Sequence, residues 1–266
     1  MSRCATAGPI SFRRFSSECL AEARHMSRHG EAYARTGLGR FYETFRICAE
    51  YIKPGARVLS VGAGGAHVEK ALQRSFDAQV TVIEFPQAVD AHREDYAKHG
   101  FRTVGLDLAR QWRLDDREPF DLALSLEVLE HLPVAPRDHI AAVAKRLRPG
   151  GHLVLSTPNL ARLTSVVRLL AGRPILHDPD LVFRSTSYEC EHVHRREYVA
   201  AEIVQAIRQA GLSAVRTHYI FADGGRAADP RAWAMRLLST INPRFRNIML
   251  FVARRGESPL PADDLE

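Results

Sequence analysis

Cysteine is scarce in this 266-residue chain, and Cys4, Cys19, Cys48 and Cys190 stand far apart, without a Cys-x-x-Cys pair. This spacing argues against a zinc ribbon or a disulfide scaffold and fits a reducing cytosol. Residues 1–15 lack the apolar core of a secretory signal, and no apolar run elsewhere is long enough to cross a bilayer. We therefore expect a cytoplasmic protein without a membrane span.

Lysine is also rare: it accounts for only four of the 37 basic residues, so the net charge of +6 rests on arginine. The arginines are scattered along the chain rather than gathered in one block. This distribution favours a solvated basic surface over a nucleic-acid footprint. With 45% hydrophobic and 26% charged residues, the composition is that of a globular protein with a sizeable core.

Short apolar strands alternate with helical patterns in the first two thirds of the chain. Strands are predicted at 57–61, 79–83, 101–104, 120–125 and 152–156, and helices at 12–52, 67–76, 87–98 and 138–147. Strands separated by helices are typical of right-handed crossovers and a parallel sheet. The pattern predicts an α/β fold of Rossmann-like type. Pro149-Gly150-Gly151 is predicted to be the turn before the strand at 152–156.

The alternation stops after residue 159. Helices are predicted at 160–171 and 198–210, and β-rich runs at 214–221 and 248–253. We expect an N-terminal helical segment, residues 1–53, that packs on a main domain spanning 54–255. Within that domain an irregular insert at about 172–196 is expected to supply the acceptor pocket and a lid. Residues 256–266 are expected to be a disordered tail.

A glycine-rich loop, Gly62-Ala63-Gly64-Gly65, follows the first strand of the alternation and precedes a helix. Glycine lets the backbone approach a ligand, and the helix start offers free N–H groups to an anionic group. Dinucleotide, phosphate and adenosylmethionine sites all use such a loop. The dinucleotide pattern Gly-x-Gly-x-x-Gly fails here because its sixth position is His67, which disfavours a nicotinamide or flavin cofactor.

Two acidic residues follow the next two strands. Glu84 ends the second strand, twenty residues after Gly64. A carboxylate in that place can accept both ribose hydroxyls of an adenosine-containing ligand. Asp107 follows the third strand, where it could accept the exocyclic amine of adenine.

Two longer motifs indicate a family. Residues 126–133 have the sequence Leu-Glu-Val-Leu-Glu-His-Leu-Pro, and residues 148–159 have the sequence Arg-Pro-Gly-Gly-His-Leu-Val-Leu-Ser-Thr-Pro-Asn. Together with the glycine loop they resemble class I S-adenosylmethionine-dependent methyltransferases. The branch they resemble includes ubiquinone-biosynthesis O-methyltransferases and many small-molecule methyltransferases, and the resemblance covers about residues 40–255. It implies a mostly parallel sheet with an antiparallel C-terminal strand hairpin and N-terminal helices.

The resemblance also implies where S-adenosylmethionine binds. The implied cofactor-binding residues are Gly62, Ala63, Gly64, Glu84, Phe85, Asp107, Leu108 and Leu126. The chain departs from the family at Ser60, where an aspartate that orients the loop is usual, and at Ala66, which replaces a third glycine. Both departures leave open a non-catalytic homologue that only binds the cofactor. Arg40 lies near a family arginine that touches the cofactor, but we expect it to be a surface residue.

A hydroxyl or ammonium acceptor must lose a proton before or during methyl transfer, which calls for a base that titrates near neutral pH. The candidate catalytic residues are His131, after the fourth strand, and His192 or His194 in the irregular insert.

Spacing also suggests a metal site. Glu127, Glu130 and His131 would share one side of a helical turn, and with His192 they could hold Mg²⁺ or a similar ion. This set resembles the metal site of small-RNA 2′-O-methyltransferases and of some ubiquinone-pathway enzymes. In the alternative, the glutamates flank a helix start and His131 packs beside the cofactor.

The sequence therefore predicts methyl transfer from S-adenosylmethionine to a small-molecule acceptor, with oxygen preferred over nitrogen as the methylated atom. The alternatives are metal-assisted RNA 2′-O-methylation and a non-catalytic homologue. Nucleic acid is not the expected partner, and the chain is expected to be a monomer or a homodimer.

Overall fold

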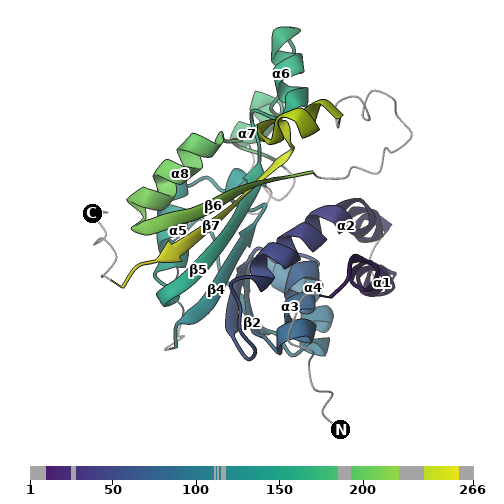
Figure 1. Cartoon of the computed structure of the whole chain (residues 1–266), viewed down its shortest axis with the longest axis vertical. Helices are drawn as coiled ribbons and strands as arrows, with labels where there is room; N and C mark the ends of the chain where they lie inside the picture. Colours follow the sequence, from purple (N-terminus) through teal and green to yellow (C-terminus); the bar gives the residue numbers. More distant parts are fainter. Residues whose placement is uncertain are drawn as a thin grey trace.

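The computed structural model describes residues 10–24, 28–110, 112, 114, 118–184, 193–221 and 237–257. Its strands are β1 Arg57–Val61, β2 Gln79–Glu84, β3 Arg102–Gly105, β4 Phe120–Leu126, β5 Leu147–Pro158, β6 Leu212–Ile220 and β7 Ile248–Arg255. They form one sheet in the order β3-β2-β1-β4-β5-β7-β6, which crosses the molecule in Figure 1. β1 to β5 are parallel, and β7 is antiparallel to both β5 and β6. The predicted fold class is confirmed.

Helices cover both faces of this sheet. They are α1 Phe12–Ala23, α2 Arg28–Ala49, α3 His67–Phe76, α4 Pro86–Lys98, α5 Pro136–Ala144, α6 Leu163–Leu170, α7 Pro179–Arg184 and α8 Ala200–Gln209, with 3-10 turns η1 Leu129–His131 and η3 Pro243–Phe245. Val58 of β1 packs into the core beneath α1 to α3, and its neighbour Leu59 packs into the core beneath α5 and α8. A central parallel strand is buried on both faces and is therefore apolar at consecutive positions. This apolar run is the feature of the sequence that predicted the strand.

The turn predicted at Pro149-Gly150-Gly151 is wrong. These residues lie inside β5, which begins at Leu147 and pairs with β4 through an irregular register between Phe120 and Leu122. The helix predicted at 138–147 is accordingly α5, which starts at Pro136 and ends at Ala144. Proline fits the first turn of a helix because no partner is needed there for its missing N–H.

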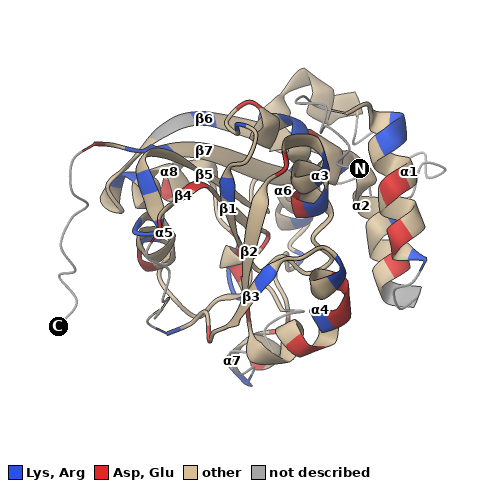
Figure 2. Ribbon diagram, turned by 90° about the horizontal axis from the view of Figure 1, so that it is seen from below, with Lys and Arg blue, Asp and Glu red and all other residues tan. Residues whose placement is uncertain are grey.

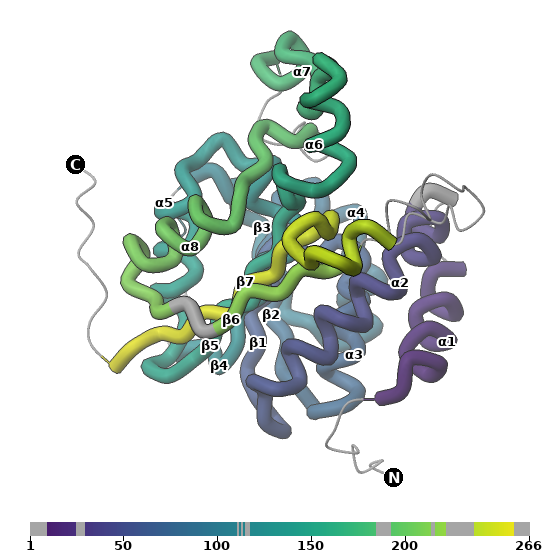
Figure 3. Tube along the Cα trace, turned by 45° about the horizontal axis from the view of Figure 1, so that its top comes forward, coloured from purple at the N-terminus to yellow at the C-terminus, as the bar shows by residue number. Residues whose placement is uncertain are grey.

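The insert at 172–196 is not wholly irregular, since it contains α7. Figure 3 shows α6 and α7 projecting together from one end of the molecule. Their apolar side chains include Leu170 and Phe183, which are 84% and 86% exposed. Residues 185–192 of the insert, and residues 258–266 of the predicted tail, lie outside the described residues. No described helix combines the length and the apolar character needed to cross a membrane.

A buried ion network fastens α1 and α4 to α3. The fully buried Nζ of Lys70 lies 2.6 Å from Asp95 and 3.6 Å from Glu22. Arg74 adds a 2.6 Å contact to the same Glu22. Figure 2 marks the acidic positions of α1 in red. The network ties the N-terminal helices to the helix that follows the glycine loop.

Lys70 is predicted to be the most sensitive member of this network. The change Lys70→Ala leaves the partly buried Asp95 without its close cation and Glu22 with Arg74 alone, and it should lower the free energy of unfolding by about 3 kcal/mol. Urea denaturation measures this loss. Lys98→Ala, on the exposed side of α4, is the control and should change stability by less than about 0.5 kcal/mol. A loss at Lys70 as small as that of the control would show that the network contributes nothing.

Candidate functional site

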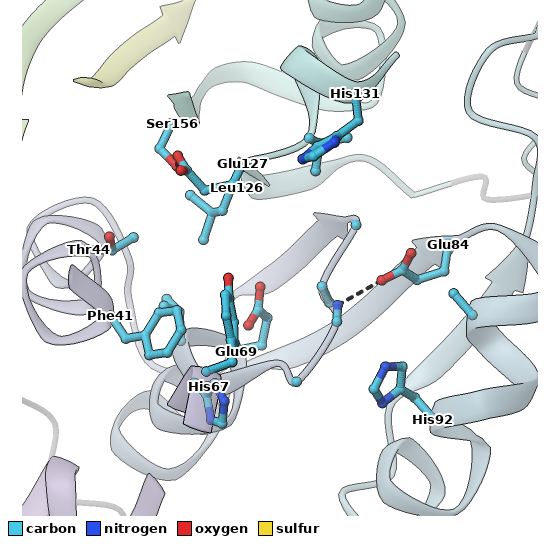
Figure 4. A pocket seen from close by; sticks show the side chains of 18 of the residues that line it. Phe41, Thr44, His67, Glu69, Glu84, His92, Leu126, Glu127, His131 and Ser156 are labelled. Carbon is cyan, nitrogen blue, oxygen red and sulfur yellow. Dashed lines mark hydrogen bonds between the residues drawn. The ribbon is translucent and has the colours of Figure 1, made fainter. Parts of the chain in front are cut away.

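A cavity of about 650 Å³ lies at the carboxyl ends of β1, β2, β4 and β5 and is closed on one side by α2. We call it the pocket, and Figure 4 shows the side chains that line it. Its size is within the range of small-molecule sites, and in open α/β sheets ligands bind at this edge. Of the candidates from the sequence, the pocket wall contains Gly62, Ala63, Gly64, Glu84, Phe85, Leu108, Leu126, Glu127, Glu130, His131 and His194.

The glycine loop adopts a conformation that explains two of its glycines. Gly62 has a φ of 69°, and a Cβ there would lie 2.4 Å from Cγ2 of Val128. Gly64 has a φ of 50°, and a Cβ there would meet no atom within 4 Å. Ala66 keeps the same left-handed backbone, with a φ of 50°, without being a glycine. The departure at Ala66 therefore preserves the shape of the loop at the cost of local strain.

Glu84 fixes this loop from the end of β2. Its Oε1 accepts a 2.7 Å hydrogen bond from the backbone N–H of Gly64, drawn as a dashed line in Figure 4. The hydroxyl of Tyr96 donates to the carbonyl oxygen of the same Gly64 at 2.8 Å. Phe85, His92 and Leu108 line the pocket beside Glu84. The carboxylate predicted from spacing is thus in the pocket and in contact with the loop.

Asp107 is not brought to the pocket wall. Its Oδ1 accepts from the backbone N–H of Ala109 at 3.0 Å, and its Oδ2 pairs with Arg110 at 3.1 Å. Both oxygens serve the turn after β3. The next residue, Leu108, lines the pocket instead.

The prediction that Arg40 is a surface residue is wrong. Its side chain is 12% exposed, lines the pocket and forms an ion pair of 3.1 Å with Glu127. The guanidinium lies over the rings of Tyr33 and Phe41, and it donates to the hydroxyl of Tyr33. Arg40 is largely buried because α2 packs against the carboxyl ends of the strands, a contact that the sequence of the helix does not reveal.

Glu127 does not share a helical turn with Glu130 and His131, so this part of the prediction is wrong. It precedes η1 with a φ of 57°, and its carboxylate accepts from Ser156 at 2.8 Å as well as from Arg40. Figure 4 shows Glu127 beside Ser156, with His131 farther along the wall. Glu130 is buried, and its Oε2 accepts from Thr157 at 3.0 Å. Burial, with repulsion from Glu127, raises the pKa of Glu130 well above its usual range.

Two histidines meet at this end of the pocket. The rings of His131 and His194 lie 4.9 Å apart at nearly right angles. Nδ1 of His131 faces the carbonyl oxygen of Val193 at 3.1 Å, and Nδ1 of His194 faces the carboxylate of Glu197 at 3.0 Å. Ligand atoms of Glu130, His131 and His194 all lie within 4.8 Å of one another. His192, the other candidate from the insert, lies outside the described residues.

Sequence analysis missed several polar residues of the pocket. Glu69, in the first turn of α3, lines it while only 2% exposed, and its Oε1 accepts from the hydroxyl of Ser60 at 2.6 Å. His67 stacks on Phe41 with 4.8 Å between ring centres, and neither of its ring nitrogens has a hydrogen-bond partner among the described residues. Burial lowers the pKa of His67 to about 4. The sequence signal that could have identified both residues as pocket residues was their position just after the glycine loop.

Comparison with known proteins agrees with this geometry. The profile of a family described as a methyltransferase domain matches residues 31–217. The chain belongs to the class I S-adenosylmethionine-dependent methyltransferases. The methyltransferase is 39% identical over 119 residues to a ubiquinone biosynthesis O-methyltransferase of Xanthomonas campestris, a match of 42% of this chain and 47% of that protein. It is 29% identical over 160 residues to one of Xylella fastidiosa, covering 59% and 61%. The chain thus spans about half the length of the first of these relatives.

Solved structures show that the fold is shared. A putative methyltransferase in complex with the Trm112 activator of Haloferax volcanii superposes with a TM-score of 0.59 at 16% identity, covering 94% of this chain and 99% of that one. An S-adenosylmethionine-dependent methyltransferase of Mesorhizobium loti gives 0.54 at 22% identity, covering 80% and 97%. At these identities the likeness establishes the architecture of this methyltransferase and nothing about its acceptor.

Proposed function

We propose that the protein transfers the methyl group of S-adenosylmethionine to the oxygen of a small-molecule acceptor held beside His131. The observation that carries this proposal is the continuity of the pocket, whose wall includes both the glycine loop with Glu84 and the histidine pair. Membership of the methyltransferase family supports the cofactor, and the names of the curated relatives support O-methylation.

The residues of the pocket fit the cofactor. The side chain missing at Gly64 leaves open space, and His67 has ring nitrogens without hydrogen-bond partners in the described chain. Glu84, next to the glycine loop, would hold the ribose hydroxyls, and Leu126 would cover the cofactor at the end of β4. Bound S-adenosylmethionine supplies an activated methyl group on a sulfonium. The protein's part is to position the acceptor and exclude water.

His131 is suited to take the acceptor's proton. Because its Nδ1 faces the carbonyl oxygen of Val193, that nitrogen carries the hydrogen, and Nε2 keeps its lone pair. The change His131→Ala should lower kcat by about 100- to 10,000-fold, as loss of a general base does. Affinity for S-adenosylhomocysteine, measured by calorimetry, should stay within about twofold of the original protein's. Unchanged kcat would remove His131 from the mechanism.

The acceptor class is tested by transfer of labelled methyl from S-adenosylmethionine to a panel of phenols and catechols, primary amines and short RNAs. The proposal expects methylation of hydroxylated aromatic compounds and none of RNA. Label appearing on RNA would support 2′-O-methylation instead. RNA is not the expected acceptor because the basic positions in Figure 2 are spread over several elements rather than gathered on one. Label on none of these classes would favour the non-catalytic alternative.

A metal-assisted form of the reaction has one specific observation in its favour. Glu130 Oε1 is buried without a hydrogen-bond partner among the described residues, 3.8 Å from Nε2 of His131. His194, oriented by Glu197, would complete the set. Such oxygen and nitrogen ligands suit Mg²⁺ or a transition metal, which would lower the pKa of the acceptor hydroxyl.

This second candidate predicts sensitivity to chelators. Dialysis against EDTA should lower activity at least about tenfold, as loss of an activating ion would, and Mg²⁺ or Mn²⁺ should restore it. The His194→Ala protein should need a higher concentration of the ion for the same activity. Full activity after EDTA, with no ion detected by mass spectrometry, would leave His131 to act as a base without metal.

A further inference from the structure

The glycine loop divides the pocket into two ends. Figure 4 shows Glu84 and His92 on one side of the loop, and Phe41, Thr44 and Glu69 on the other. If Glu84 holds the ribose, the amino-acid part of S-adenosylmethionine must extend toward Glu69. This part carries one carboxylate and one ammonium group, so the second end must offer partners for both charges.

Glu69 and Glu127 differ in what already neutralises them. Glu127 accepts from both Arg40 and Ser156. Glu69 has the hydroxyl of Ser60 as its side-chain partner, and no ion pair joins it to another described residue. The neighbouring Lys70 points away, toward Asp95 and Glu22. Among the described residues at this end of the pocket, Glu69 is a carboxylate without an ion-pair partner.

A buried carboxylate that has one hydroxyl and one backbone N–H as hydrogen-bond donors, and no ion pair, is undercompensated. Removing a charged group from water is costly unless several hydrogen bonds or an opposite charge replace the solvent. Burial accordingly raises the pKa of Glu69 above its usual value, although the hydrogen bonds from Ser60 and from its own backbone, and the charge of Lys70, oppose the shift. Because the side chain lines the pocket, a positively charged ligand group can reach it.

We propose that Glu69, held in place by Ser60, receives the ammonium group of the methionine part of the cofactor. This inference rests on the cofactor placement proposed above. It also gives a physical account of Ser60. The negative charge that the resembled family carries at the end of the first strand is supplied here from the first turn of α3, and Ser60 has become its hydrogen-bond donor.

The test compares two ligands that differ in one group. S-adenosylhomocysteine carries the ammonium group, and its desamino analogue differs from it only in lacking that group. The original protein should bind S-adenosylhomocysteine more tightly than the analogue by about 10- to 100-fold, the range of a charged hydrogen bond. In the Glu69→Gln protein this preference should shrink to within about threefold, while affinity for the analogue changes little. Glu94→Gln, an exposed change on α4, should keep the full preference.

Stability of the ligand-free protein separates binding from folding. A carboxyl group whose pKa is higher in the folded than in the unfolded state destabilises the fold once it is ionised at neutral pH. The ligand-free Glu69→Gln protein should therefore melt at the same temperature as the original or higher.

Three results would overturn the inference: equal weakening of both ligands by Glu69→Gln, an unchanged preference in that protein, or a lowered melting temperature with loss of both ligands. If the original protein binds neither ligand, the cofactor placement itself fails. Retained binding in Glu69→Gln with an unchanged preference leaves that placement standing and rejects the role of Glu69 alone.

Discussion

The Glu84→Ala protein is expected to bind S-adenosylhomocysteine at least about 100-fold more weakly than the original protein. Each hydrogen bond from a hydroxyl to a carboxylate is worth about 1.5–3 kcal/mol, and Glu84 is proposed to accept two from the ribose. The same carboxylate accepts from the N–H of Gly64, so its removal also frees the loop. Isothermal calorimetry measures the affinity directly.

Two further variants separate the possible causes of that loss of affinity. Glu84→Gln keeps an oxygen that can accept from Gly64 but loses the charge, so it should fall between Glu84→Ala and the original protein. Glu94→Ala removes an exposed glutamate from the adjacent helix and should leave affinity unchanged. If Glu84→Ala bound as tightly as Glu94→Ala, Glu84 would serve the loop alone and the ribose would lie elsewhere.

Alanine at Gly62 is expected to affect mainly stability, and alanine at Gly64 mainly cofactor affinity. Gly62→Ala combines a left-handed φ with a contact of 2.4 Å to Val128, so it should lower the free energy of unfolding by about 2–4 kcal/mol. Gly64→Ala meets no protein atom and should lose about 1 kcal/mol of stability from its φ. Because Gly64 lines the pocket and its new methyl group would stand in open space, cofactor affinity should fall at least about 100-fold, as expected where overpacking blocks a site.

Urea denaturation and calorimetry on the same proteins separate the two effects. Gly55→Ala is the matched control because Gly55 has a φ of 74° and open space around its Cβ, in the turn before β1. It should lose stability as Gly64→Ala does and keep full affinity. Adding Val128→Ala to Gly62→Ala should recover part of the lost stability. A Gly64→Ala protein with normal affinity would place the cofactor away from the loop.

The predicted elements that the structure confirms are those encoded by neighbouring residues. The glycine loop lies between a strand and a helix, both of which have the predicted bounds, and Glu84 ends the next strand. Parallel topology then brings the ends of β1 and β2 together, which is why spacing alone located Glu84. The boundary errors at Pro149 and Leu147 arose because an irregular strand pairing overrode local turn preferences.

The parts that could not be predicted depend on contacts across the chain. Arg40 and Glu127 are 87 residues apart, and their pairing turns an expected surface arginine into a pocket residue. The left-handed backbone at Glu127 breaks the helical spacing on which the metal prediction relied. Glu69 could not be distinguished from an ordinary acidic residue at a helix start until the structure showed that it was buried next to Ser60.

The ion pair between Arg40 and Glu127 has a kinetic consequence. It joins α2 to the segment after β4, and these two parts of the chain form facing walls of the pocket. Opening of a lid or a helix is much rarer than thermal motion of side chains and can limit product release in enzymes. We therefore expect this ion pair to lengthen the residence time of the spent cofactor in the pocket.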